Sequence, residues 1–160
     1  MIQKTPEAPL GLSPPDLPPI RIHGAAYGEL DAAMLARSVL IIEDEAMIAW
    51  TLEGLLSDMG FKHIVLAASG ADAIEQARRT KPGLILSDIN LGAGEMDGIA
   101  AVAAIVDSEV AVVFITAYAS QESRQQISRD LPRAAMLHKP IDASTLRHAI
   151  TAVFARGKAH

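Results

Sequence analysis

Short apolar segments alternate with longer amphipathic segments along the chain from residue 38 onward. Five of the short segments are rich in β-branched and other apolar residues, which is typical of strands buried on both faces of a sheet. They are Val39–Ile42, Ile64–Ala67, Leu84–Ser87, Val110–Ile115 and Ala134–Leu137. Because helical segments separate them, the pattern predicts parallel βαβ units. It therefore predicts an α/β domain with a doubly wound sheet and helices on both faces.

Apolar residues at helical spacing occupy the segments between the strands. In the first segment Ile48, Leu52 and Leu55 lie on one helical face, and Gly60 stands where a C-terminal cap is expected. In the second, Ser69 stands at the N-cap position. The predicted helices cover about 45–59, 69–80, 98–107, 120–129 and 142–154.

The first 37 residues follow a different pattern. Six of the nine prolines of the chain fall between Pro6 and Pro19. Proline fixes φ and removes a backbone donor, so this segment is predicted to be an extended tail or linker. Residues 29–37 contain strong helix formers and could form a short helix that acts as a connector or a dimer contact. The expected organisation is thus an N-terminal extension over 1–37, one domain over 38–156 and a tail over 157–160.

Composition excludes several classes of function. The chain has no cysteine, which excludes disulfides, thiolate nucleophiles and cysteine-ligated zinc. A net charge of −5 gives no electrostatic reason to expect binding to nucleic acid or to an anionic membrane. The N-terminus lacks the pattern of a secretory signal, and no apolar run is long enough to span a bilayer. A cytoplasmic protein is therefore expected.

Polar side chains follow four of the five predicted strands directly. Since parallel strands all end at one edge of the sheet, we expect these side chains to lie close together. They are Glu43 and Asp44 after the first strand, Asp88 and Asn90 after the third, Thr116 after the fourth, and Lys139 with Pro140 after the fifth.

Grouped carboxylates repel one another unless a cation lies between them, and Mg²⁺ prefers carboxylate oxygens. A carboxylate beside such a cation can accept a phosphoryl group, while an ammonium and a hydroxyl stabilise the phosphoryl oxygens. The sequence therefore predicts a phosphoryl-transfer site at this edge.

Four stretches resemble the signature motifs of the receiver domains of two-component signalling, in the same order and spacing. They are residues 39–45 (VLIIEDE), 87–91 (SDINL), 114–118 (FITAY) and 138–140 (HKP). The resemblance covers about residues 38–155. It implies a flavodoxin-like, five-stranded parallel sheet of order 2-1-3-4-5.

The same resemblance implies a role for each residue of the site. Asp88 would be the phosphoacceptor. Mg²⁺, or Mn²⁺, would be bound by Asp44, Asp88 and the main-chain carbonyl of Asn90, with Glu43 acting mainly through water. Thr116 and Lys139 would hold the phosphoryl group, and Thr116 and Tyr118 would take part in the switch. Pro140 matches the cis-proline turn of the family.

Partners are implied in the same way. The phosphoryl group would come from a sensor histidine kinase or a histidine phosphotransfer protein, and the signal would leave through residues 120–154. Phosphate relay, phosphate sink and direct output all remain open, as do a monomer and a phosphorylation-dependent dimer. The protein would be a stand-alone signalling receiver that catalyses only its own phosphorylation and dephosphorylation.

Three features depart from the commonest pattern of the family. Gly92-Ala93-Gly94 lengthens the loop after the acceptor, so that Gly98 falls ten residues after Asp88, and this loop is expected to be more mobile. Met136 replaces an aromatic residue often found on the fifth strand. Residues 114–118 partly match a receiver subgroup with the motif Phe-Ala-Thr-Gly-Tyr, in which Tyr118 would shield an aspartyl phosphate from water and prolong its lifetime.

Two other classes of function fit these residues less well. A hydrolase of the haloacid-dehalogenase type also uses an aspartate nucleophile and Mg²⁺, but it needs an Asp-x-Asp motif after the first strand, where Glu43-Asp44-Glu45 stands. A pure interaction module with a vestigial site disagrees with the complete set of acids, hydroxyl and lysine. Met47, on the first predicted helix, is expected to fill the core or its edge. Trp50, on the same helix, is expected to pack at an edge, with an exposed Trp that anchors a partner as the alternative.

Overall fold

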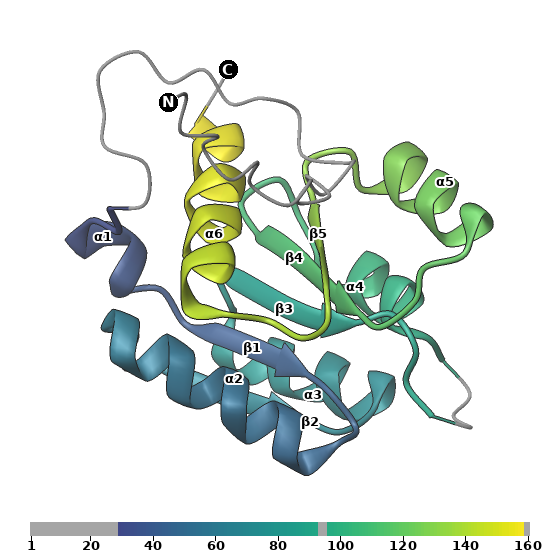
Figure 1. Ribbon diagram of the computed structural model, residues 1–160, viewed down its shortest axis with the longest axis horizontal. Helices are drawn as coiled ribbons and strands as arrows, with labels where there is room; N and C mark the ends of the chain where they lie inside the picture. The colour runs from purple at the N-terminus through teal and green to yellow at the C-terminus, as the bar shows by residue number, and fades with distance from the viewer. Residues whose placement is uncertain (1–28, 93–95, 159–160) are drawn as a thin grey trace, which may run out of the picture.

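The computed structural model describes residues 29–92 and 96–158 and contains one five-stranded parallel sheet (Figure 1). The strand order is β2-β1-β3-β4-β5, which confirms the predicted fold. The strands are β1 (Val39–Ile42), β2 (Ile64–Ala67), β3 (Leu84–Asp88), β4 (Ala111–Thr116) and β5 (Ala135–His138). The helices are α1 (Ala32–Leu35), α2 (Ala46–Met59), α3 (Gly70–Thr80), α4 (Gly98–Ile105), α5 (Gln121–Asp130) and α6 (Ala143–Lys158).

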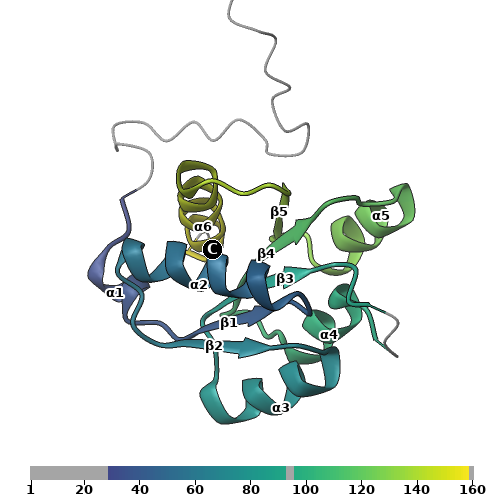
Figure 2. The same cartoon turned by 60° about the horizontal axis from the view of Figure 1, so that its bottom comes forward.

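Helices cover both faces of the sheet, as Figure 2 shows for α2 and α6 on one side and α3 and α4 on the other. Alternate residues of each strand belong to two separate apolar clusters. In β1, for example, Val39 and Ile41 pack against α2 and α6, whereas Leu40 and Ile42 pack against α3 and α4. Burial on both faces explains why the strands are apolar along most of their length, up to the polar residues at their carboxyl ends.

Polar side chains fix the points where the helices begin. Ser69, Asp97, Ser120 and Asp142 each accept a hydrogen bond from a backbone N–H three residues later, at 3.1, 2.8, 3.0 and 2.8 Å. Gly60 ends α2 with φ of 108°, a conformation that favours glycine. These caps fix where the loops at the carboxyl edge of the sheet enter the following helices.

The predicted boundaries differ from the structure by a few residues. β3, β4 and β5 include Asp88, Thr116 and His138, because main-chain pairing continues through these polar positions. The fourth helix ends at Ile105 rather than at 107, since Val106 is extended, with ψ of 141°. The last helix continues to Lys158, beyond the predicted end at Phe154.

The N-terminal region is described only from residue 29. The predicted extended segment over 1–28 and the centre of the loop predicted to be mobile, residues 93–95, lie outside the described residues. Within 29–37 the structure has the short helix α1, whose N-cap Asp31 accepts from the Met34 N–H at 2.8 Å. Across the described ranges, no helix combines the length and apolarity needed to cross a bilayer.

Candidate functional site

Three carboxylates meet at the carboxyl edge of the sheet. Glu43 follows β1, Asp88 ends β3, and these strands are neighbours in the sheet. One carboxylate oxygen each from Glu43, Asp44 and Asp88 lie within 4.8 Å of one another. Glu43 is 3% exposed and Asp88 6% exposed, whereas Asp44 is open to solvent. Hard oxygen donors with one solvent-facing side fit a divalent cation that keeps part of its water shell.

Lys139 reaches this cluster from β5, across β4. Its Nζ donates to Glu43 Oε2 at 2.9 Å and to Asp88 Oδ2 at 2.9 Å. Burial raises the pKa of the Glu43 carboxyl above its ordinary value, and the hydrogen bond from Lys139 offsets part of the rise. Burial opposes the charge on Lys139, but the hydrogen bonds to Asp88 and Glu43 outweigh it and raise the lysine pKa. The ammonium is therefore charged at neutral pH and hydrogen-bonded to the Asp88 carboxylate.

The main chain around Asp88 is tightly held. Asn90 N donates to Asp88 Oδ1 at 3.0 Å, and the buried Ser87 hydroxyl donates to the Asp88 carbonyl at 2.9 Å. Gly98, at the start of α4, donates to the Ile89 carbonyl at 2.9 Å. A Cβ at Gly98 would overlap the Asp88 carbonyl oxygen, so only glycine fits there.

The loop after β3 also approaches the exposed acid. Gly92 has φ of 43°, and a Cβ built on it would lie 2.8 Å from Asp44 Oδ2. The lengthened loop thus brings its backbone against the acidic cluster at this position. The sequence indicates an insertion at this glycine but carries no signal of its close approach to Asp44.

Thr116 and Tyr118 form a second group at the end of β4, the strand that pairs with β3 on the side opposite β1. The buried Thr116 hydroxyl donates to the Tyr118 carbonyl at 2.8 Å and accepts from Asn90 Nδ2 at 3.1 Å and from Tyr118 N at 3.3 Å. Asn90 Nδ2 also donates to the Tyr118 carbonyl at 3.0 Å. Tyr118 is 72% exposed, so most of its surface is open to solvent.

Pro140 follows Lys139 in the turn after β5. The Lys139–Pro140 bond is cis, as the motif implied, and Lys139 N donates to the Thr116 carbonyl at 2.9 Å. Met136, in the position where an aromatic residue is common, is buried among apolar residues that include Phe114 and Ile127.

Two expectations about apolar residues are wrong. Trp50 is 62% exposed and Met47 is 78% exposed, so these side chains do not pack at the edge of the core. They lie one turn apart on α2, on the face opposite its buried residues Leu52, Leu56 and Met59. Helical spacing places both residues outside the apolar stripe of α2 and near its polar residues Thr51 and Asp58, so the sequence did carry a signal of their exposure.

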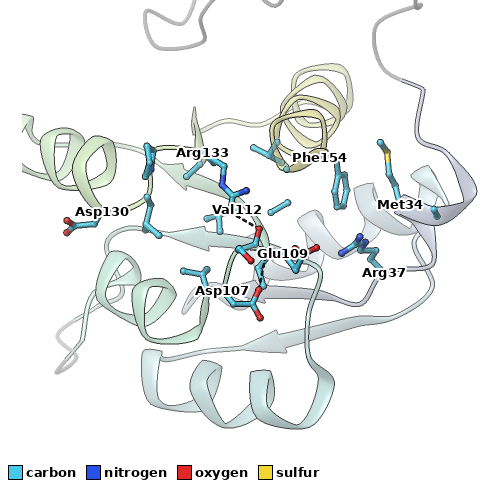
Figure 3. Close-up of a pocket in the computed structure, with 18 residues that line it drawn as sticks. Met34, Arg37, Asp107, Glu109, Val112, Asp130, Arg133 and Phe154 are labelled. Carbon is cyan, nitrogen blue, oxygen red and sulfur yellow. Dashed lines mark hydrogen bonds between the residues drawn. The ribbon is translucent and has the colours of Figure 1, made fainter. Parts of the chain in front are cut away.

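A cavity of about 320 Å³ lies at the other end of the sheet, near the amino ends of β4 and β5 (Figure 3). The described residues that line it include Arg37, Glu109, Val112, Arg133 and Phe154, and none of the predicted site residues. The cluster at the carboxyl edge is therefore the place where the predicted chemistry is assembled.

Comparison with known proteins decides the family. Residues 39–151 match the response regulator receiver domain. The chain belongs to this family. The receiver is 34% identical over 128 residues to the transcriptional regulatory protein PdtaR of Mycobacterium tuberculosis, covering 80% of this chain and 61% of PdtaR. It is 45% identical over 89 residues to the phyllosphere-induced regulator PhyR of Methylorubrum extorquens, covering 54% of this chain and 33% of PhyR.

Solved structures agree with the fold of the receiver. The receiver domain of PhyR from Erythrobacter litoralis, solved by NMR, matches with a TM-score of 0.64 and 35% sequence identity, covering 80% of this chain and 97% of that one. The chain thus spans almost all of an isolated receiver domain, but only about three-fifths of PdtaR and one third of the M. extorquens PhyR. Membership of the family places this protein in two-component signalling.

Proposed function

We propose that this receiver accepts a phosphoryl group on Asp88 in a reaction that depends on Mg²⁺ or Mn²⁺. A histidine kinase or a histidine phosphotransfer protein would be the donor. The observation that carries the proposal is the convergence of three carboxylates with the Lys139 ammonium at the end of three strands. Asp88 lies at the centre of this group, with one oxygen bonded to Lys139 and the other to Asn90 N.

The chemical step is a displacement at phosphorus. An oxygen of the Asp88 carboxylate attacks the phosphorus of a phosphohistidine, the new P–O bond forms, and the P–N bond breaks with its electron pair left on the imidazole nitrogen. Lys139 neutralises negative charge on the transferred oxygens from a fixed position, which needs little reorganisation. Thr116 contributes a hydroxyl donor once it leaves the Tyr118 carbonyl.

The acids would hold the cation. Asp44, Asp88 and the main-chain carbonyl of Asn90 are the proposed ligands, and Glu43 would act mainly through water. When bound, the cation supplies positive charge beside the phosphoryl oxygens. It would also relieve the repulsion among the three carboxylates, two of which already accept hydrogen bonds from Lys139.

Phosphorylation would then change a protein surface rather than start a further reaction. The proposed surface is α5, β5 and α6, over about 120–154, whose loops begin at Thr116 and Lys139. A ligand shifts a two-state equilibrium only through contacts that differ between the states, and the Thr116 hydroxyl supplies such a contact. We place this switch in the cytoplasm, in a monomer or a phosphorylation-dependent dimer.

The proposal is tested by incubating the chain with a small-molecule phosphodonor and Mg²⁺ and measuring intact mass. The expected result is the addition of one phosphoryl group to the wild type, none to Asp88→Asn, and none to the wild type in a metal chelator. Steady release of phosphate from phosphate esters would favour a hydrolase. No modification under any condition would favour an interaction module with a vestigial site.

A further inference from the structure

One side-chain amide connects the loops on either side of the acceptor. Asn90, two residues after Asp88, donates through Nδ2 to Thr116 Oγ1 at 3.1 Å and to the Tyr118 carbonyl at 3.0 Å. The carbonyl oxygen can only accept, so the amide must turn its NH₂ group, and not its oxygen, toward this loop. The chemistry of the three groups thus fixes the orientation of the Asn90 side chain.

The Thr116 hydroxyl is fully engaged by this arrangement. A hydroxyl has one proton to donate, and Thr116 donates it to the Tyr118 carbonyl at 2.8 Å. The same oxygen accepts from Asn90 Nδ2 and from Tyr118 N. Thr116 therefore cannot donate to a phosphoryl group on Asp88 until its bond to the Tyr118 carbonyl is released. The two bonds that it accepts oppose any shift of the hydroxyl oxygen.

We propose that the Asn90 side chain is a positioning residue that holds Thr116 and Tyr118 in the unphosphorylated conformation and so opposes the switch. This inference rests on the proposed function. Burial decides which of the two hydrogen bonds matters more. The bond to Thr116 is partly buried and ends on a residue that is 0% exposed, whereas the bond to the Tyr118 carbonyl is exposed, so water replaces the second bond more readily than the first.

The side chain of Asn90 can be altered separately from its main chain. The Asn90 N–H orients Asp88, and its carbonyl is the proposed cation ligand, and both remain in an alanine variant. Asn90→Ala therefore removes the contact with Thr116 and leaves the main-chain groups of the pocket in place.

The experiment titrates the full chain with beryllofluoride, a mimic of the phosphoryl group, in saturating Mg²⁺, and follows the amide NMR signals of Thr116 and Tyr118. Loss of one hydrogen bond that exists only in the unphosphorylated state should lower the half-saturating concentration by about three- to tenfold in Asn90→Ala. In a Thr116→Val background, where no hydroxyl is held, Asn90→Ala should change the midpoint by less than about twofold.

An unchanged or higher midpoint in Asn90→Ala would overturn the inference, and so would an equal gain in the Thr116→Val background. Thermal unfolding of each variant provides the structural control, because a purely structural role would lower the unfolding temperature without changing the midpoint for the mimic. If the wild type itself does not bind beryllofluoride, the proposed function fails and the inference fails with it. If the wild type binds and Asn90→Ala binds equally well, only the role of Asn90 is rejected.

Discussion

The carboxyl edge of the sheet carries two groups of polar side chains that differ in how far they are arranged for phosphoryl transfer. In the ionic group, Lys139 is already bonded to Asp88 and Glu43 at 2.9 Å. In the second group, called here the Thr116 cluster, Thr116 and Asn90 are hydrogen-bonded to each other and to the Tyr118 main chain. A phosphoryl group on Asp88 would meet a charged site that is ready and a hydroxyl donor that is not.

The difference follows from what holds each group. Glu43 and Asp88 lie at the ends of β1 and β3, in the middle of the sheet, and Lys139 follows the edge strand β5, which ladder pairing holds against β4. The hydrogen bonds of the Thr116 cluster depend on the short loop 117–119, whose first two residues are exposed. A rigid charged site with a movable loop beside it is what a two-state switch requires, because the bound group can then favour one loop conformation.

The largest expected effect comes from Lys139→Met, which removes the preformed charge. Loss of a fixed positive donor to developing phosphoryl charge should slow phosphorylation by a small-molecule donor by about two to three orders of magnitude. The rate is measured by mass spectrometry at fixed Mg²⁺. Circular dichroism must show a folded variant, since Glu43 and Asp88 lose their shared partner.

Lys62→Met is the matched control, because Lys62 is exposed and precedes β2, at the amino end of the parallel sheet, whereas the acids lie at its carboxyl end. It should phosphorylate at the wild-type rate. A Lys139→Met variant that reacts within a few-fold of wild type would show that the ionic group is not prepared for the reaction in the way proposed.

A smaller effect is expected where the backbone holds Asp88 in place. Gly98→Ala should destabilise the protein by about 2 kcal/mol, because the new methyl group must displace the main chain at Asp88. The matched variant is Gly54→Ala, in the middle of α2, where a Cβ meets no heavy atom within 4 Å. That change should stabilise the protein by about 0.5–1 kcal/mol, since alanine favours a helix over glycine.

Both glycine variants are measured by urea unfolding, followed by phosphorylation of the folded protein. The displaced acceptor should also make Gly98→Ala slower to phosphorylate, while Gly54→Ala keeps the wild-type rate. Equal stability of the two variants would mean that the main chain at Asp88 shifts at little cost to accommodate the new methyl group. The ionic group would then be no more rigid than the Thr116 cluster.

The sequence predicted which residues of the ionic group lie close together, but not the hydrogen bonds within the Thr116 cluster. Apolar runs define the strands, and the topology of parallel strands brings their ends together, so the proximity of Glu43, Asp88 and Lys139 follows from the pattern alone. The Asn90 contacts depend on a side-chain rotamer and on the path of a loop, neither of which leaves a periodic signal. Exposure of Trp50 and Met47 was missed for a different reason: residue type was given more weight than helical spacing, and hydrophobicity indicates only a tendency to be buried.

The smallest expected effect concerns Tyr118, which lies in the loop 117–119 and is 72% exposed. If release of Thr116 moves this loop toward Asp88, the ring is carried over the aspartyl phosphate and excludes water from it. Tyr118→Ala should then speed spontaneous dephosphorylation by about threefold, while Tyr118→Phe, which keeps the ring, should match the wild type. The measurement follows loss of the phosphorylated mass after the donor is removed. An unchanged rate in Tyr118→Ala would mean that the ring stays in solvent after phosphorylation, so that the loop rearranges only around Thr116 and not as a whole.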